Sequence, residues 1–286
     1  MCDPWLVESA YEWKQYYCAE RERLGSETLE ALLGGARPLD VDPTGAVIVP
    51  HTRFEVTGGQ IASAVTTVLA SGADRVLALG VLHGGRRSDR GRVEAARSGN
   101  TDALAELRGV HDEDGLASEE FSLDAFVELL DRAAERVGRS VDVIRRYPFL
   151  VGADPATLPG LAELEGLVAD GVALVATTDP IHHGHAYGTP STECAASALG
   201  ETRSDARAAI DDQLAALSDH RFEDFAVLTE IHKSDFRDTG PVLAHLLGSG
   251  FESTVHDLEL VDYSAALDAP APTWVAGALV TACTAA

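Results

Sequence analysis

Apolar runs and segments with helical periodicity alternate along most of this chain. The runs that predict strands are residues 46–50, 75–80, 141–151, 172–178, 253–263 and 273–283. The periodic segments that predict helices are residues 58–72, 118–138, 155–171, 203–218 and 239–248. This alternation indicates an α/β fold, in which helices flank a central, mostly parallel or mixed sheet within a single domain.

Two parts of the chain fall outside this alternation. Residues 1–44 predict an N-terminal helical segment ahead of the α/β domain at 45–286. The aromatic residues that form a patch in this segment are Trp5, Tyr11, Trp13, Tyr16 and Tyr17. Residues 84–117 are polar with little periodicity, so we expect a loop there, and Ser118 is the expected N-cap of the next helix.

The charge of the chain limits its partners. It has 46 acidic and 22 basic residues, a net charge of −24. Because such a surface repels nucleic acid and anionic membranes, we expect neither as a partner. The acid is spread along the chain, which fits a cytoplasm of high salt that screens repulsion. No apolar run approaches the roughly 18 residues of a membrane span, and no secretory signal is evident. We expect a cytoplasmic, halophilic protein that acts on a small molecule, with a homo-oligomer left open.

Three predicted strands each run into a histidine. The strands that begin at positions 46, 75 and 172 are followed within a few residues by His51, His83 and His182. In an open α/β sheet the carboxyl ends of parallel strands gather at one edge, where ligands bind. A single histidine at a strand end is usually a surface or capping residue, so the interpretation depends on all three positions. Two histidines with one carboxylate form the site of non-haem Fe(II) oxygenases, and the pattern therefore indicates a metal centre.

The sequence pattern leaves the carboxylate ligand open. Residues 229–241, expected as a loop before a helix, offer the candidates Glu230, His232, Asp235 and Asp238. Asp179 lies three residues before His182, where a carboxylate can orient a metal ligand or tune a general base. No CxxC pair is present, so a zinc site built from cysteines is not expected.

The remaining histidines are expected to have lesser roles. His220, His245 and His256 are assigned to the surface or to packing, and His111 and His185 to loops that are exposed or contact the substrate.

Several segments, in order, resemble the Memo-like family, which is related to the class III extradiol ring-cleaving dioxygenases. They are "VIVPHTRFEVTGGQIA" (47–62), "DRVLALGVLHG" (74–84), "EEFSLDAF" (119–126), "VALVATTDPIHHG" (172–184) and "DYSAALDAPAPTWVAGALV" (262–280). Each segment alone is weak, but the ordered set is fairly specific and covers most of residues 45–282. The first ~40 residues lie outside the resemblance.

The resemblance implies roles for individual residues. His51 matches the histidine of the family's Pro-His motif, and His83 matches the first histidine after its Gly-Pro-Ser strand end. Asp179 and His182 match the acid and the histidine of the Ser-Asp-x-x-His motif. Near the C-terminal end Memo-like proteins have a metal-binding cysteine, and the dioxygenases have a glutamate. Counting back from "GPVLAHLL" places Asp235 at that position.

The chain also departs from the family pattern. Glu120 and Asp124 match the acids of the Glu-His-Ser-Leu-Glu motif, but Phe121 stands where that motif has its histidine. Gly84 replaces a second histidine after His83. These departures leave room for a non-enzymatic member of the family.

The resemblance implies a metal centre of His51, His83 and Asp235. A shift of the register by a few residues would bring in His232 or Glu230 instead. Fe(II) is the expected metal, with zinc and copper as alternatives.

Three functions follow from this metal centre. The first is an extradiol-type dioxygenase acting on a small hydroxylated or aromatic substrate, in which His182 moves a hydroxyl proton and Asp179 holds its ring. The second is a zinc hydrolase that uses the same ligands. The third is a non-enzymatic Memo-like protein that binds metal or a partner, because one fold can host several functions.

Overall fold

The computed structural model describes residues 10–42, 44–84, 88–194 and 199–284. The strands in these ranges are β1 (Ala46–Val49), β2 (Arg75–Leu79), β3 (Gly109–His111), β4 (Asp142–Phe149), β5 (Ala173–Thr177), β6 (Ile181–Gly184), β7 (Glu252–Asp262) and β8 (Thr273–Cys283). They form one sheet with the order β3-β4-β2-β5-β1-β8-β6, and β7 pairs with β8. The predicted α/β fold with a mixed central sheet in a single domain is confirmed.

The sheet has a parallel half and an antiparallel half. β4, β2, β5 and β1 are neighbours and run parallel, whereas β3, β8, β6 and β7 are antiparallel to the strands they pair with. The carboxyl ends of the four parallel strands therefore share one edge of the sheet.

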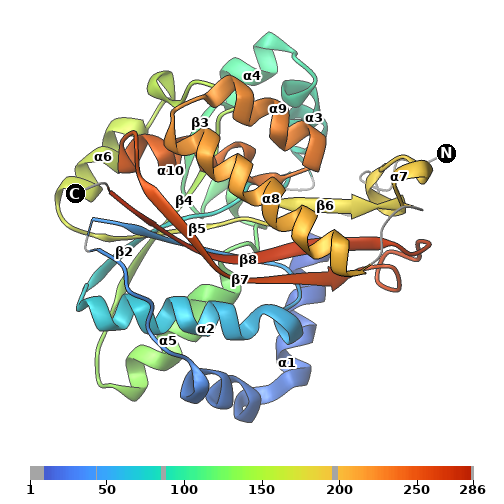
Figure 1. The fold of residues 1–286 in the computed structure, drawn as a ribbon. Helices are drawn as coiled ribbons and strands as arrows, with labels where there is room; N and C mark the ends of the chain where they lie inside the picture. Colours follow the sequence, from blue (N-terminus) through green and yellow to red (C-terminus); the bar gives the residue numbers. More distant parts are fainter. Residues whose placement is uncertain (1–9, 43, 85–87, 195–198, 285–286) are drawn as a thin grey trace.

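Helices cover both faces of the sheet (Figure 1). The helices are α1 (Ala10–Gly35), α2 (Phe54–Ser71), α3 (Arg90–Arg97), α4 (Thr101–Leu107), α5 (Asp124–Arg136), α6 (Leu161–Ala169), α7 (Ser191–Cys194), α8 (Leu199–Ser218), α9 (Phe222–His232) and α10 (Thr239–Leu247). Short 3₁₀ turns are η2 (Gly115–Ala117), η3 (Pro155–Thr157), η4 (His185–Tyr187) and η5 (Asp235–Arg237). α1, α2 and α5 lie on one face of the sheet, and α6, α8, α9 and α10 lie on the other.

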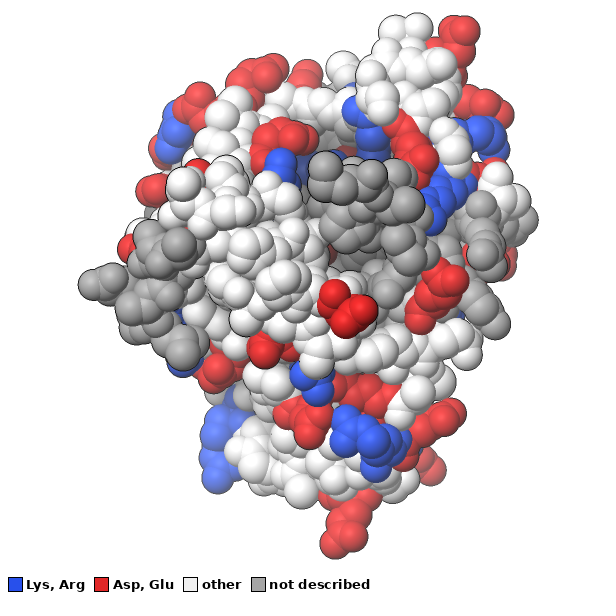
Figure 2. Space-filling view, turned by 90° about the vertical axis from the view of Figure 1, so that its right-hand side faces the viewer, with Lys and Arg blue, Asp and Glu red and all other residues white. Residues whose placement is uncertain are grey.

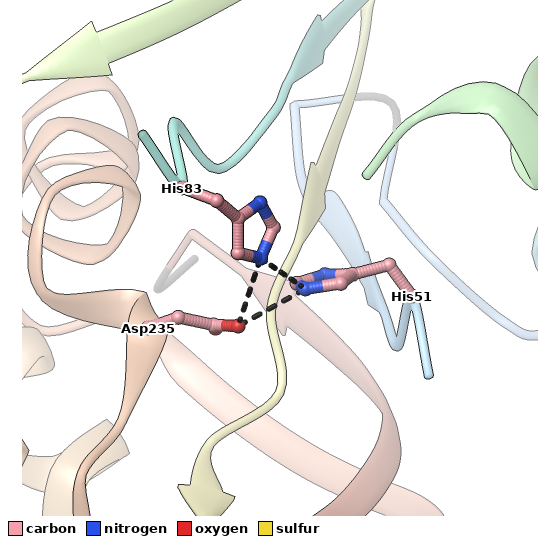
Figure 3. A group of neighbouring side chains, drawn as sticks. All are labelled: His51, His83 and Asp235. Atoms are coloured by element: carbon pink, nitrogen blue, oxygen red, sulfur yellow. Dashed lines mark hydrogen bonds and ion pairs between the residues drawn. The ribbon is translucent and has the colours of Figure 1, made fainter. Parts of the chain in front are cut away.

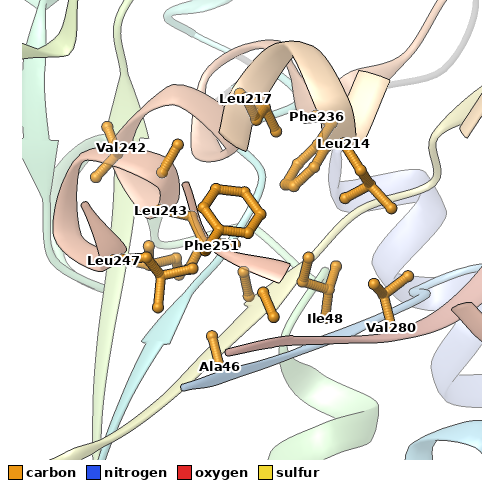
Figure 4. Close-up of a cluster of buried hydrophobic side chains, with 14 of the residues drawn as sticks. Ala46, Ile48, Leu214, Leu217, Phe236, Val242, Leu243, Leu247, Phe251 and Val280 are labelled. Carbon is orange, nitrogen blue, oxygen red and sulfur yellow. The ribbon is translucent and has the colours of Figure 1, made fainter. Parts of the chain in front are cut away.

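The core has one cluster on each side of the sheet. Alternate residues of β1 point to opposite faces, as the period of a strand requires. Ile48 joins Leu214, Phe236 and other residues of the cluster under α8 and α10 (Figure 4). Val47 and Val49 join the cluster under α2 and α5. β1 is buried along its whole length, so the segment that follows it, which includes His51, starts from a fixed position.

The prediction of a loop at 84–117 is wrong. Within the described part of that stretch the chain forms α3, α4, β3 and η2. These elements are short and bury few apolar side chains, among them Val93 and Ala96, so no long period shows in the sequence. Local polar contacts define them instead: the Asn100 side chain caps α4 by accepting the backbone N–H groups of Asp102 and Ala103.

Two further predictions need correction. The helix predicted at 118–138 begins only at Asp124, so Ser118 is not its N-cap. The preceding residues are used elsewhere, because the Ser122 hydroxyl accepts the backbone N–H of Val81 after β2. The loop predicted at 229–241 is also wrong: α9 continues to His232, and η5 and α10 follow.

β7 lies at the outside of the antiparallel half and, among the described residues, pairs with β8 alone. Two arginines of α8 reach its carbonyl oxygens. Arg207 Nη1 donates to Val255 O at 3.3 Å, and Arg203 Nη2 donates to Leu258 O. The backbone of this strand is therefore hydrogen-bonded on its outer side by side chains.

The surface reflects the composition. Figure 2 shows acidic side chains spread over one face of the molecule with basic ones among them. Within the described ranges, every helix is too short or too polar to cross a bilayer.

Candidate metal centre

The parallel strands bring two of the three predicted histidines, His51 and His83, to one edge of the sheet, whereas His182 lies on the separate strand β6 and not at the end of β5. β2, β5 and β1 are consecutive neighbours in the sheet. His51 follows β1, His83 follows β2 by four residues, and Asp179 follows β5 between them. Asp235 does not come from a strand; it is the first residue of η5, the turn that follows α9. The edge of the sheet and one turn therefore build the centre.

Three ligand atoms converge (Figure 3). His51 Nε2 lies 3.2 Å from His83 Nε2 and 3.0 Å from Asp235 Oδ2, and His83 Nε2 lies 3.8 Å from that oxygen. Ligands bound at about 2.1 Å in a tetrahedral site are about 3.4 Å apart. The group could hold a metal ion.

Outer contacts fix both imidazole rings. His51 Nδ1 lies 3.0 Å from Thr177 Oγ1, and His83 Nδ1 lies 3.0 Å from Glu120 Oε2. If each Nδ1 donates, both Nε2 atoms present lone pairs to each other at hydrogen-bond distance. A proton or a cation between them removes that repulsion, which is the usual arrangement of metal-bound histidine. Phe121 stacks on His83 with ring centroids 4.5 Å apart, which also holds the ring.

The carboxylate of Asp235 is oriented in the same way. Its Oδ1 accepts the Thr178 hydroxyl at 2.9 Å and the backbone N–H of Asp179 at 2.8 Å. Its Oδ2 is buried without a hydrogen bond of good geometry and faces the two histidines. Because this buried carboxylate oxygen and two imidazole nitrogens face one another, a cation among them would neutralise the carboxylate, so the residues fit a metal.

The charges of the cluster shift several pKa values. Burial lowers the pKa of His83, but the carboxylates of Asp235 and Glu120 outweigh it and raise that pKa to about 10. Burial raises the pKa of Asp235, yet the facing imidazoles of His51 and His83 hold it well below its usual range. Burial, aided by the charge of Asp235, raises the pKa of Asp179 to about 7. In the metal-free protein, protonated imidazole therefore balances Asp235.

Asp179 and His182 form an adjoining group with Asp235, and it too could hold a metal ion. His182 lies on β6, and its Nδ1 is 2.8 Å from the carbonyl oxygen of Lys233, which makes Nδ1 the donor and leaves Nε2 as the basic nitrogen. Burial lowers the pKa of His182, so the ring is neutral at physiological pH. Asp179 was expected to hold the His182 ring, but at Nδ1 the Lys233 carbonyl orients that ring. Asp179 Oδ1 instead accepts the backbone N–H of His51 at 3.2 Å.

The other candidates for the carboxylate position are not in these groups. Glu230 and His232 lie on α9, where Glu230 is exposed, and neither belongs to the metal-binding groups of the described residues. Asp238 Oδ1 accepts the backbone N–H groups of Leu150 and Val151, so its role is to hold the end of β4.

The remaining histidines occupy packing or surface positions. His220 stacks on Phe222, and His245 forms an ion pair with Glu165 at 2.8 Å. His256 lies on β7, and its Nε2 is 2.8 Å from Thr281 Oγ1. His111 and His185, expected in loops, lie on β3 and η4, so that part of the prediction is wrong. His111 Nε2 lies 2.7 Å from Leu107 O, so this ring bonds its own segment of the chain.

Sequence reasoning missed the supporting residues. Thr177 and Thr178 directly precede Asp179 and each bonds a ligand side chain. Glu120 was matched only as a family acid, and its contact with His83 gives it an orienting function. Two threonines at the end of a buried strand were the available signal.

No family model and no curated protein matches this chain. The function therefore has to be argued from the geometry of the cluster.

Proposed function

We propose that the chain is a mononuclear metal-dependent enzyme of the extradiol dioxygenase type, with Fe(II) held by His51, His83 and Asp235. The observation that supports this proposal is the convergence of two imidazole nitrogens and one carboxylate oxygen on a common point. Two histidines and one carboxylate are the ligands of non-haem Fe(II) oxygenases. The resemblance to Memo-like proteins points to the same ligands, with Asp235 at the third position.

The residues beside the ligands supply proton transfer. His182, neutral and with Nε2 as its basic nitrogen, takes the proton of a substrate hydroxyl. General acid–base help of this kind contributes roughly 10²–10⁴-fold. Asp179, with its pKa raised to about 7, exchanges protons close to neutral pH. A bound Fe(II) supplies coordination positions for the hydroxylated substrate and for dioxygen.

Metal content and oxygen uptake test the proposal together. We expect the chain to retain iron after anaerobic loading and to consume dioxygen with catechols. His51→Ala should lose the iron, whereas His111→Ala, whose imidazole bonds a backbone carbonyl instead, should keep it. Absence of iron, or full iron retention in His51→Ala, would remove the proposal. Iron retention without oxygen uptake for any hydroxylated aromatic compound would reject the dioxygenase activity.

A zinc hydrolase is the second candidate. Ligand separations of 3.0–3.8 Å fit tetrahedral zinc as well as iron. Asp179 then acts as the base for a metal-bound water. Hydrolysis of esters or amides by the zinc-loaded chain in the absence of oxygen separates this function from the first.

A further inference from the structure

A file of aromatic rings leads away from the candidate metal centre. Phe121 stacks on His83, with ring centroids 4.5 Å apart and an interplanar angle of 20°. Tyr17 stacks on Phe121 at 5.1 Å and 29°, and Trp13 stacks on Tyr17 at 5.5 Å and 21°. We call these four residues the ring stack.

The ring stack joins a metal ligand to the surface. His83 directs its Nε2 at the cluster, Phe121 and Tyr17 are buried, and Trp13 is partly exposed. Tyr17 and Trp13 come from α1, which rises beside the sheet toward the edge that carries the ligands (Figure 1). The N-terminal helix, which lies outside the resemblance, is therefore in contact with a residue that stacks on a metal ligand.

The near-parallel order of the ring stack differs from the other aromatic contacts around α1. Aromatic pairs in cores adopt edge-to-face or offset arrangements, and both are present around α1. Tyr16 meets Trp13 and Tyr17 edge-on, at 87° and 80°. The three contacts of the ring stack are all near-parallel and follow one another in order, so an electron that passes from Trp13 to His83 crosses only the gaps between adjacent rings.

The Tyr17 hydroxyl belongs to a chain of hydrogen-bonded hydroxyl groups. It lies 2.6 Å from the hydroxyl of Tyr263, which in turn lies 2.7 Å from Thr52 Oγ1. Tyrosine and tryptophan are the side chains that lose an electron most readily after cysteine, and Phe121 between Tyr17 and His83 can serve only as a bridge. A path with two oxidisable rings and a bridge connects the centre to solvent.

We propose that the ring stack is an electron path by which Trp13 reduces the metal centre when it reacts with peroxide instead of completing turnover. The proposal rests on the proposed function, because it needs a redox-active metal at His51, His83 and Asp235.

The reaction balances as follows. Hydrogen peroxide takes two electrons, one from Fe(II) and one from the Trp13 indole, and its O–O bond breaks. The indole N–H proton and one solvent proton complete two water molecules. The products are Fe(III), the neutral indolyl radical and water. Because Trp13 supplies the second electron, the side chains next to the metal escape oxidation.

Radical trapping tests the path without a turnover assay. The full chain, loaded with Fe(II) and checked by elemental analysis, is mixed with hydrogen peroxide and frozen rapidly for electron paramagnetic resonance. We expect an organic radical that ring deuteration of tryptophan identifies as an indolyl radical. Trp13→Phe should lose that signal, and Phe121→Leu should lose it by breaking the bridge.

Trp274→Phe is the matched control. Trp274 stacks on His183 at 4.8 Å and 26°, so it resembles Trp13 in geometry but lies outside the ring stack. This variant should keep the signal. Iron content and circular dichroism establish that each variant is folded and loaded.

The outcomes separate the two proposals. An undiminished indolyl signal in Trp13→Phe, its loss in Trp274→Phe, or its absence from the iron-loaded parent chain overturns the electron path while leaving the metal centre intact. A chain that binds no iron overturns both. A role in packing alone predicts lower stability in Trp13→Phe with an unchanged radical.

Discussion

Metal binding is expected to release a proton from His83. In the metal-free protein the carboxylates of Asp235 and Glu120 raise the pKa of this imidazole to about 10. A metal needs the neutral ring, because Nε2 must offer a lone pair. At pH 7 the ring is about three units below its pKa, so deprotonation opposes binding by about 4 kcal/mol. The His83 side chain is 24% exposed, and solvent screening makes this an upper value.

The pH dependence of affinity measures this effect. Because one proton leaves per metal bound, the association constant should rise about tenfold per pH unit between about pH 8 and about pH 9. Asp179, with a pKa of about 7, is already ionised in that window and does not contribute. Calorimetric titration with a divalent metal, repeated in buffers of different ionisation enthalpy, counts the released protons directly.

A substitution at Glu120 and the stability of the metal-free protein test the same His83 pKa. Glu120→Gln removes one of the two carboxylates, so it should lower the His83 pKa and reduce the proton release. The raised pKa also stabilises the metal-free fold, fully below the ordinary value of 6.5 and progressively less as the pH rises through about 10. The free energy of unfolding of the metal-free protein should therefore fall over that range. An affinity independent of pH, with heats that do not depend on the buffer, would refute this account.

Four further substitutions have defined outcomes. Thr178→Val removes the hydroxyl that orients Asp235, and metal affinity measured by competition with a chelating dye should fall roughly 10–100-fold. Gly184→Ala should cost about 1–3 kcal/mol from its backbone at φ 113° alone, and more because the added carbon overlaps a backbone carbonyl. Gly188→Ala is the matched control: at φ 72° in open space it should cost only about 1 kcal/mol, with both variants measured by urea denaturation. Phe225→Ala should cost about 3–5 kcal/mol, because that ring is fully buried; a loss below about 1 kcal/mol would contradict its place in the core.

The half of the centre that comes from the sheet could be predicted from sequence. His51, His83 and Asp179 follow apolar runs, and parallel strands bring such positions to one edge regardless of loop length. Their proximity depends on β2, β5 and β1 being neighbours. The strand pattern does not contain that order, but any parallel arrangement leaves these residues on the same side of the molecule.

The carboxylate could not be chosen from the pattern. Four candidates lay close together, and the local geometry decides among them. The Ser234 side chain accepts the backbone N–H of Phe236 and starts η5, which turns Asp235 toward the sheet and Phe236 into the core. α9 ends at His232, two residues before Ser234, and His232 belongs to neither metal-binding group of the described residues. Only the resemblance singled out Asp235.

The elements that were missed are those with weak hydrophobic periods. α9 has Val227 and Ile231 exposed at 60% and 63%, so its apolar residues do not fall on one face. α3 and α4 are stabilised by capping and by ion pairs such as Arg90–Glu94 at 2.9 Å. Patterns of burial predict helices that cover a core, and they lose sensitivity for helices that mainly face water.

The arginines beside β7 have a consequence for the behaviour of the protein at high concentration. A strand of 11 residues with an unpaired side is a template on which other chains can add, and it favours polymerisation. Arg203 and Arg207 already occupy two of its carbonyl oxygens, and the acidic side chains of Glu252 and Glu259 stand on the same strand. Exchange of both arginines for neutral residues should therefore increase edge-to-edge association of the chain through β7.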